Sequence, residues 1–179
     1  YAYAGAVDGY DNTGGGMKIA GVTGDVIFRN NRADAGELAS DWNGNFGAVY
    51  SGQDLDISNI GGDLRFEGNQ ASNSAGAFGV SGNFNLNNIG SFTFIGNHAD
   101  KTYAVGWISK DWNVTNTGNI TISGNSSDNQ MGGVAVFGNT TFSNNGDITV
   151  EGNSTKGSNG ALRFYGTFSV TDAGNISLS

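Results

Sequence analysis

The stretch that decides the fold reads Gly62-Asp63-Leu64-Arg65-Phe66-Glu67-Gly68-Asn69. Apolar and polar residues alternate in it, and a Gly-Asn pair follows, which is the pattern of a short half-buried strand that ends in a tight turn. The same pattern, Gly-[Asp/Asn/Ser]-apolar-x-apolar-x-x-Asn, recurs at 24–31, 90–97, 118–125 and 146–153, and is cut short at 174–178. Successive copies begin 38, 28, 28, 28 and 28 residues apart, so the chain is built from an internal repeat.

Two further columns of mainly apolar residues follow the same period. One contains Met17, Leu55, Phe84, Trp112, Thr140 and Phe168, and the other contains Val7, Val49, Phe78, Gly106, Val134 and Leu162. Residues two positions later continue most of these columns, which is the alternation of a β-strand. We therefore predict an all-β fold, a right-handed parallel β-helix (solenoid) with three strands per coil and about six coils of 28 residues. Residues 1–179 are expected to form this single domain.

Composition and charge agree with such a fold and exclude several functions. Glycine (31 residues) and asparagine (24 residues) together make up 55 of the 179 residues, which is incompatible with a mostly helical chain. Proline is absent, so every residue after the first has a backbone N–H that can pair with a neighbouring strand. Cysteine is also absent, so there is no disulfide framework. The net charge of -8 argues against nucleic acid and anionic membranes as partners. No apolar run approaches the roughly 20 residues of a transmembrane segment.

The end of each repeat predicts a structural ladder. The pairs Gly68-Asn69, Gly96-Asn97, Gly124-Asn125 and Gly152-Asn153 suit tight corners with left-handed backbone angles. One asparagine per repeat would then stack on the next and form amide hydrogen bonds, at Asn31, Asn69, Asn97, Asn125 and Asn153. The inward-facing Phe28, Phe66 and Phe94 precede this column and are expected to stack in the interior.

The first repeat is longer than the others, and residues 32–46 are expected to leave the coil as an inserted loop. Loops on a rigid scaffold often carry function. Within this loop Trp42 could stack on a sugar, with Asp34, Glu37 and Asp41 beside it as further binding candidates. Trp107 is a second candidate for sugar stacking, whereas Trp112 falls in an inward column and is expected in the core.

The repeats resemble those of polymorphic membrane proteins and related autotransporter passenger domains. The resemblance rests on Phe-x-x-Asn-x-Ala, read at Phe66–Ala71, Phe28–Ala33 and Phe94–Ala99, followed by motifs such as Gly76-Ala77-Phe78 and Gly47-Ala48-Val49. It covers nearly the whole chain. The resemblance implies a secreted or surface-exposed bacterial protein that is adhesive or structural rather than catalytic. We expect no membrane-anchoring β-barrel among these 179 residues, which is a departure from the full-length pattern of that family.

Parallel β-helices also include polysaccharide lyases and hydrolases, which need grouped carboxylates or calcium-binding acids on one outer face. Here two outward columns, those that contain Asn85 and Thr93, are uncharged from the third coil onward, and we predict no catalytic residue, no cofactor and no metal site. Asp8 and Asp11 are candidates for Ca²⁺ binding, although their spacing matches no complete calcium loop. The single histidine, His98, is interpreted as an exposed corner residue.

The two ends of the repeat array show no capping helix pattern. The apolar residues at these ends are Tyr1, Tyr3 and Val7 on one side and Ile176 and Leu178 on the other. An uncapped stack can continue into a longer passenger rod or into an end-to-end homopolymer. We expect a non-enzymatic extracellular or cell-surface protein with a structural or adhesive role, with itself and a host-surface or glycan ligand as partners. A β-helix polysaccharide lyase or hydrolase and a glycan-binding adhesin acting through 32–46 are the alternatives.

Overall fold

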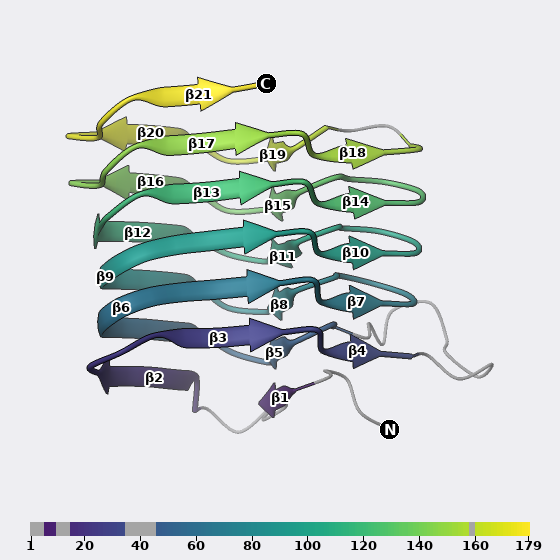
Figure 1. Cartoon of the computed structure of the whole chain (residues 1–179), viewed down its shortest axis with the longest axis horizontal. Coiled ribbons are helices and arrows are strands. Elements are labelled where there is room, and N and C mark those ends of the chain that lie inside the picture. Colours follow the sequence, from purple (N-terminus) through teal and green to yellow (C-terminus); the bar gives the residue numbers. More distant parts are fainter. Residues whose placement is uncertain (1–5, 10–14, 35–45, 158–159) are drawn as a thin grey trace.

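The computed structural model describes residues 6–9, 15–34, 46–157 and 160–179. They form a right-handed parallel β-solenoid in which each coil lies directly on the one before it (Figure 1). The described residues form strands and turns and contain no helix. The predicted fold is therefore confirmed, and equivalent residues of neighbouring coils pair in parallel about 28 residues apart.

One sheet has six short strands in the order β1-β5-β8-β11-β15-β19, and it lies at the back in Figure 1. Its strands are β1 (Val7–Gly9), β5 (Val49–Ser51), β8 (Phe78–Val80), β11 (Gly106–Ile108), β15 (Val134–Val136) and β19 (Leu162–Phe164). Val49 pairs with Phe78, and Gly106 pairs with Val134, which is the register that the repeat predicts.

The second sheet has ten strands and bends around a corner of the coil. Its strands are β2 (Met17–Val22), β3 (Val26–Arg29), β6 (Leu55–Glu67), β9 (Phe84–Ile95), β12 (Trp112–Thr117), β13 (Ile120–Ser123), β16 (Thr140–Ser143), β17 (Ile148–Glu151), β20 (Phe168–Thr171) and β21 (Ile176–Leu178). In β6 and β9 the two strands that the sequence predicts for a coil run together as one bent strand, whereas a turn divides them in the later coils.

A third sheet consists of two-residue strands that the sequence analysis did not predict. These strands are β4 (Arg32–Ala33), β7 (Gln70–Ala71), β10 (His98–Ala99), β14 (Ser126–Ser127) and β18 (Ser154–Thr155). They follow the asparagine column directly, so the corner asparagine positions them. The first two residues of the predicted insert at 32–46 therefore belong to the coil, since Arg32 and Ala33 pair with Gln70 and Ala71.

The interior is a continuous column of apolar side chains that stack from coil to coil. Phe28 stacks on Phe66 with ring centroids 4.8 Å apart, and Phe66 contacts Phe94 at 5.1 Å. Trp112 is fully buried, as expected, and its ring lies 6.3 Å from that of Phe84. A single coil could not bury these side chains alone, so the stacking of coils is what creates the core.

Glycine at one corner, and asparagine or aspartate at another, carry the backbone around the coil with positive φ angles. Gly68, Gly96, Gly124 and Gly152 adopt positive φ at the corner before the asparagine column, as the Gly-Asn pairs predicted. The corner between the two arms of the large sheet also needs a left-handed residue, and there the chain uses Asn59, Asn88, Asn116, Asn144 and Asp172. Asn and Asp tolerate this conformation better than other residues with side chains, because their short polar groups bond locally.

The structure brings the predicted asparagine column together as a hydrogen-bonded ladder. The backbone N–H and the side-chain Nδ2 of Asn69 both donate to Oδ1 of Asn97, at 3.0 and 2.9 Å. The same two bonds join Asn31 to Asn69, Asn97 to Asn125, and Asn125 to Asn153. Asn69, Asn97 and Asn125 are completely buried, and each Nδ2 also donates to a phenylalanine carbonyl of the preceding coil. Every polar atom of these side chains is therefore satisfied inside the protein.

Candidate binding groove

The predicted binding loop is only partly described by the structure. Trp42, Asp41 and Glu37 lie outside the described residues, while Asp34 is exposed and its carboxylate pairs with Arg32 at 2.8 Å. At the other end of the segment, Phe46 is buried and forms a bridge to Ala75 of the next coil. Phe46 was expected in the loop, and its place in the coil is a correction: the ring is held against the outer surface of the six-stranded sheet.

The outer surface of that sheet does not repeat one residue type. The residues that face outward in successive strands are Tyr50, Gly79, Trp107, Ala135 and Arg163, so large and small side chains alternate. Gly79 leaves the space that Phe46 occupies, since a Cβ added at Gly79 would lie 2.1 Å from Phe46 Cε1. The Phe46 ring stacks on Tyr50 at 4.7 Å and meets Trp107 at 5.9 Å. These three rings form an aromatic cluster on the outside of the coil.

A groove of about 640 Å³ opens beside this cluster. It is lined by the aromatic residues Phe46, Tyr50, Tyr103, Trp107 and Phe137 and by the polar residues Asn73, Ser74, Thr102, Ser109 and Gln130. Tyr50, Tyr103 and Trp107 are partly exposed, and Phe137 is exposed and stacks on Tyr165 with ring centroids 4.7 Å apart. The groove thus combines several aromatic faces with neutral hydrogen-bonding groups.

The turn after each two-residue strand supplies the polar side of the groove. Ser74, Thr102 and Gln130 hold the same position in three successive coils, next to the bridges that join Ala75, Tyr103 and Met131. The Thr102 hydroxyl donates to the Ser74 carbonyl, and Ser127 Oγ donates to the Thr102 carbonyl at 2.8 Å. These bonds hold the turns in place, so the polar rim has a defined shape.

Tyr103 remains a neutral phenol at physiological pH. Burial raises the pKa of Tyr103 above its ordinary value; Tyr165 raises it further, and Arg163 opposes the shift. A raised pKa means that the protonated form is favoured in the fold, so its O–H group can serve as a hydrogen-bond donor in the groove.

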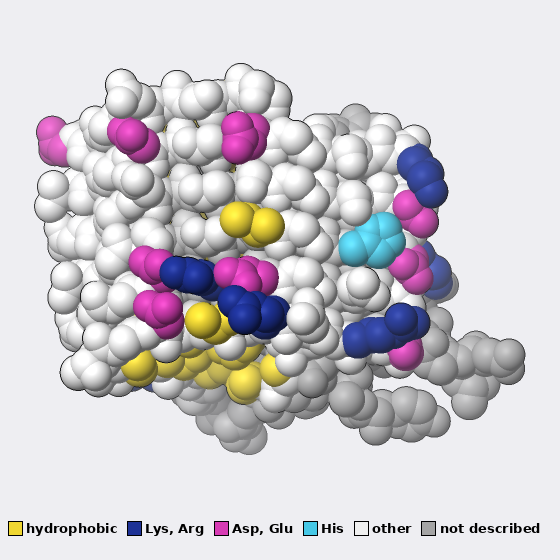
Figure 2. Space-filling model, in the orientation of Figure 1, with side chains coloured by type: hydrophobic (Ala, Val, Ile, Leu, Met, Phe, Trp, Pro, Cys, Tyr) yellow, Lys and Arg dark blue, Asp and Glu magenta, His cyan; other side chains and the backbone are white. Residues whose placement is uncertain are grey.

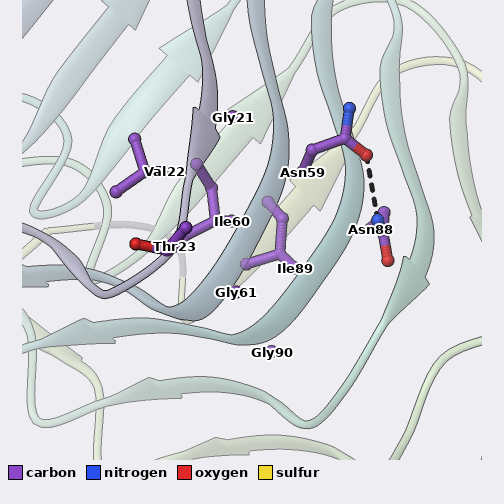
Figure 3. A pocket seen from close by; sticks show the side chains of 9 residues that line it. All are labelled: Gly21, Val22, Thr23, Asn59, Ile60, Gly61, Asn88, Ile89 and Gly90. Atoms are coloured by element: carbon purple, nitrogen blue, oxygen red, sulfur yellow. Dashed lines mark hydrogen bonds between the residues drawn. The ribbon is translucent and has the colours of Figure 1, made fainter.

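A second, smaller hollow of about 400 Å³ lies at the left-handed corner of the first coils (Figure 3). Three of its nine lining residues are glycines, and the side-chain amide of Asn88 donates to Oδ1 of Asn59 at 2.9 Å. Ile60 and Ile89 are buried beneath it. This hollow lies at the corner formed by Asn59 and Asn88 and offers few free polar groups, so we assign it no binding role.

His98 is more connected than its interpretation as an exposed corner residue implies. It lies in β10, where Nδ1 contacts Ser126 Oγ at 2.9 Å and Nε2 contacts Asp100 Oδ1 at 3.1 Å. Possible ligand atoms of His98, Asp100 and Asp128 lie within 4.8 Å of one another. Lys156 Nζ lies 2.9 Å from Asp128 and is the main cause of that carboxyl group's lowered pKa. The cluster is thus satisfied by hydrogen bonds and ion pairs.

Charged side chains on the front face gather over the early coils (Figure 2). Arg65 forms an ion pair with Asp63 and lies 3.9 Å from Asp25, while Arg29 pairs with Glu67 at 2.6 Å. The hydrogen bond from Ser91, followed by that from Arg65, lowers the pKa of Asp63. Asp25 Oδ1 also accepts the backbone N–H of Asp63 at 2.9 Å, so Asp25 caps the start of the equivalent strand segment in the next coil.

The predicted assembly residues are exposed where the structure describes them. Val7 is 37% exposed, and Ile176 and Leu178 are 51% and 65% exposed. Tyr1 and Tyr3 lie outside the described residues, as does Asp11, while Asp8 is described only by its backbone in β1. The calcium prediction for Asp8 and Asp11 therefore stays a prediction.

Comparisons with protein-family models, with curated proteins and with solved structures found no match to this chain. Within the described residues, no helix is long and apolar enough to cross a membrane. The groove was missed at the level of sequence because its lining residues are far apart in the chain. The signal was present in the outward column Tyr50, Gly79, Trp107, Ala135 and Arg163, whose alternation in size appears only when the coils are aligned.

Proposed function

We propose that this protein is a non-enzymatic structural and adhesive β-solenoid, located outside the cell or at a bacterial surface, whose last described coil is covered by a further coil, either of a second copy stacked end to end or of a longer rod. The carrying observation is the last described coil, formed by β19, β20 and β21, each of which is the outermost strand of its sheet. An outermost strand presents unpaired backbone groups that can template another strand.

The side chains of this coil support the proposal. Phe168, Ile176 and Leu178 are 42%, 51% and 65% exposed. The residues one coil earlier at the same positions are Thr140, Ile148 and Val150, and they are at most 3% exposed. Covering the last coil with another would therefore bury apolar surface in the way that every inner coil already does.

The register of the repeat defines how a second copy would fit. If a copy continued the stack, Phe168 and Val170 of β20 would meet Met17 and Ile19 of β2. Ile176 and Leu178 of β21 would meet Val26 and Phe28 of β3. All of these residues are apolar, so the two faces match without an inserted charge. Such a head-to-tail contact does not close on itself and would extend into a filament.

The experiment is to measure association of the full chain over a hundredfold range of concentration, by analytical ultracentrifugation and negative-stain electron microscopy. We expect rods that lengthen with concentration, and their loss in the double variant Ile176→Asp/Leu178→Asp. Ile95→Asp, at a residue that is 43% exposed on a lateral sheet face, is the matched control and should assemble normally. Monodisperse single-chain rods at every concentration, or equal assembly of the double variant, would refute end-to-end stacking.

The non-enzymatic part of the proposal is supported by the way outward polar side chains are used. Asn85 donates to Asp56 at 2.7 Å, and Asn113 donates to Asn85 at 2.9 Å, so residues of one outer column bond to their neighbours in the stack. A screen of acidic polysaccharides with and without Ca²⁺ tests this point. Release of products would support the lyase or hydrolase alternative instead.

A further inference from the structure

We propose that the groove beside Trp107 binds a neutral oligosaccharide, with sugar rings lying against its aromatic faces. This binding goes beyond the scaffold function proposed above. The groove is lined by residues of β5 and β11 and by residues that flank the strands of four coils, whereas end-to-end stacking uses β19, β20 and β21. The two proposals can therefore fail separately.

The aromatic faces are fixed in position before any ligand arrives. Phe46 is held between Tyr50 and Trp107, at ring distances of 4.7 and 5.9 Å, and the absence of a side chain at Gly79 gives it room. Trp107 remains partly exposed beside this support. A rigid aromatic ring loses little conformational freedom on binding, and the C–H-rich face of a pyranose ring packs well on such a surface.

The rest of the lining matches the hydroxyl groups of a sugar. Asn73, Ser74, Thr102, Ser109 and Gln130 provide amides and hydroxyls, which both donate and accept hydrogen bonds. None of the residues that line the groove carries a formal charge at neutral pH, and the chain as a whole has a net charge of -8. Neutral sugars are therefore favoured over acidic ones, which the overall charge would repel.

The extent of the groove indicates a chain of sugars. Its lining residues come from four successive coils, and coils stack about 4.8 Å apart, so the groove extends roughly 14 Å along the solenoid axis. Its volume of about 640 Å³ falls within the usual range for ligand sites, which is roughly 300–1,000 Å³. An elongated ligand with several rings fits these dimensions.

The test uses the full chain on an array of neutral glycans (cello-, malto-, manno- and chito-oligosaccharides) with acidic glycans beside them. Neutral glycans that bind are then titrated by calorimetry. We expect Trp107→Ala to weaken binding by about tenfold or more, and Trp107→Phe to retain part of the affinity because it keeps an aromatic face. Ile95→Ala, an exposed apolar residue on a different face, should bind as the wild type does. Circular dichroism and melting temperature establish that each variant is folded.

If Trp107→Ala does not fold, Gln130→Ala replaces it, because Gln130 is exposed at the rim and should weaken binding without disturbing the sheet. Three results would overturn the proposal: retention of no neutral glycan, preference for acidic glycans, or unchanged affinity in the folded groove variants. Loss of glycan binding in a groove variant that still forms filaments would support the groove and leave stacking intact.

Discussion

The asparagine ladder and the aromatic groove lie in the same coils and follow opposite rules. In the ladder one residue type repeats in every coil, and Asn69, Asn97 and Asn125 are each completely buried with all polar atoms bonded. In the outward column above the groove, Tyr50, Gly79 and Trp107 differ in size from one coil to the next. Where the same residue recurs in every coil, the side chains bond to one another and leave no space between coils. Where the residue changes in size, as at Gly79, space remains for the ring of Phe46 and, beside it, for a ligand.

We expect the largest loss of stability when one asparagine of the buried ladder is replaced. Asn97→Ala removes the acceptor for Asn69 and the donor to the Phe66 carbonyl, and leaves these buried groups unpaired. We expect a loss of about 3 kcal/mol in the free energy of unfolding, measured by denaturant titration. Asn113→Ala removes one bond of a partly exposed outer column and should cost less than about 1 kcal/mol. Equal losses in the two variants would contradict the special role of the buried ladder.

We expect a smaller loss of stability when the small residue Gly79 of the outward column is enlarged. The Cβ of Gly79→Ala would displace Phe46 from its place between Tyr50 and Trp107. We expect a loss of about 1–3 kcal/mol and a shift in the fluorescence of Trp107. Gly24→Ala, where an added Cβ meets no atom within 4 Å, is the control and should change stability by less than about 0.5 kcal/mol. A Gly79→Ala protein as stable as the control would show that Phe46 is not held there.

We expect the smallest effect on stability at Asp63, which lies in a solvent-accessible column. Asp63 has a lowered pKa, chiefly because Ser91 and then Arg65 donate to its carboxylate. A lowered pKa in the fold gives stability that is present above the ordinary carboxyl pKa and is lost as the pH falls through the lowered value. The melting temperature of the wild type should therefore approach that of Asp63→Asn between pH 6 and pH 2. A difference that stays constant with pH would assign the effect to packing instead.

Much of the fold could be predicted because its signal lies in the spacing of the chain. Leu64, Phe92, Ile120 and Ile148 pair in the register that the repeat requires, because one misplaced residue would turn each apolar side chain outward. The two-residue strands were missed because two residues show no periodicity. The ladder at Asn97 could be foreseen since the same residue recurs, whereas the groove depends on Phe46, which the sequence pattern assigned to an insert.

The hydrogen bonds along the solenoid also give it a direction. In the buried ladder the backbone N–H of Asn97 donates to Oδ1 of Asn125, which belongs to the following coil. At another corner the order is reversed, since the N–H of Asp111 donates to Oδ1 of Asn83 in the preceding coil, and Asn139 donates to Asp111 in the same sense. Each coil therefore has chemically different upper and lower sides. At the ladder corner its N–H donors face the following coil, and at the other corner they face the preceding coil. Any fibre built by continuing this stack would be polar, with one end able to add subunits at a different rate from the other.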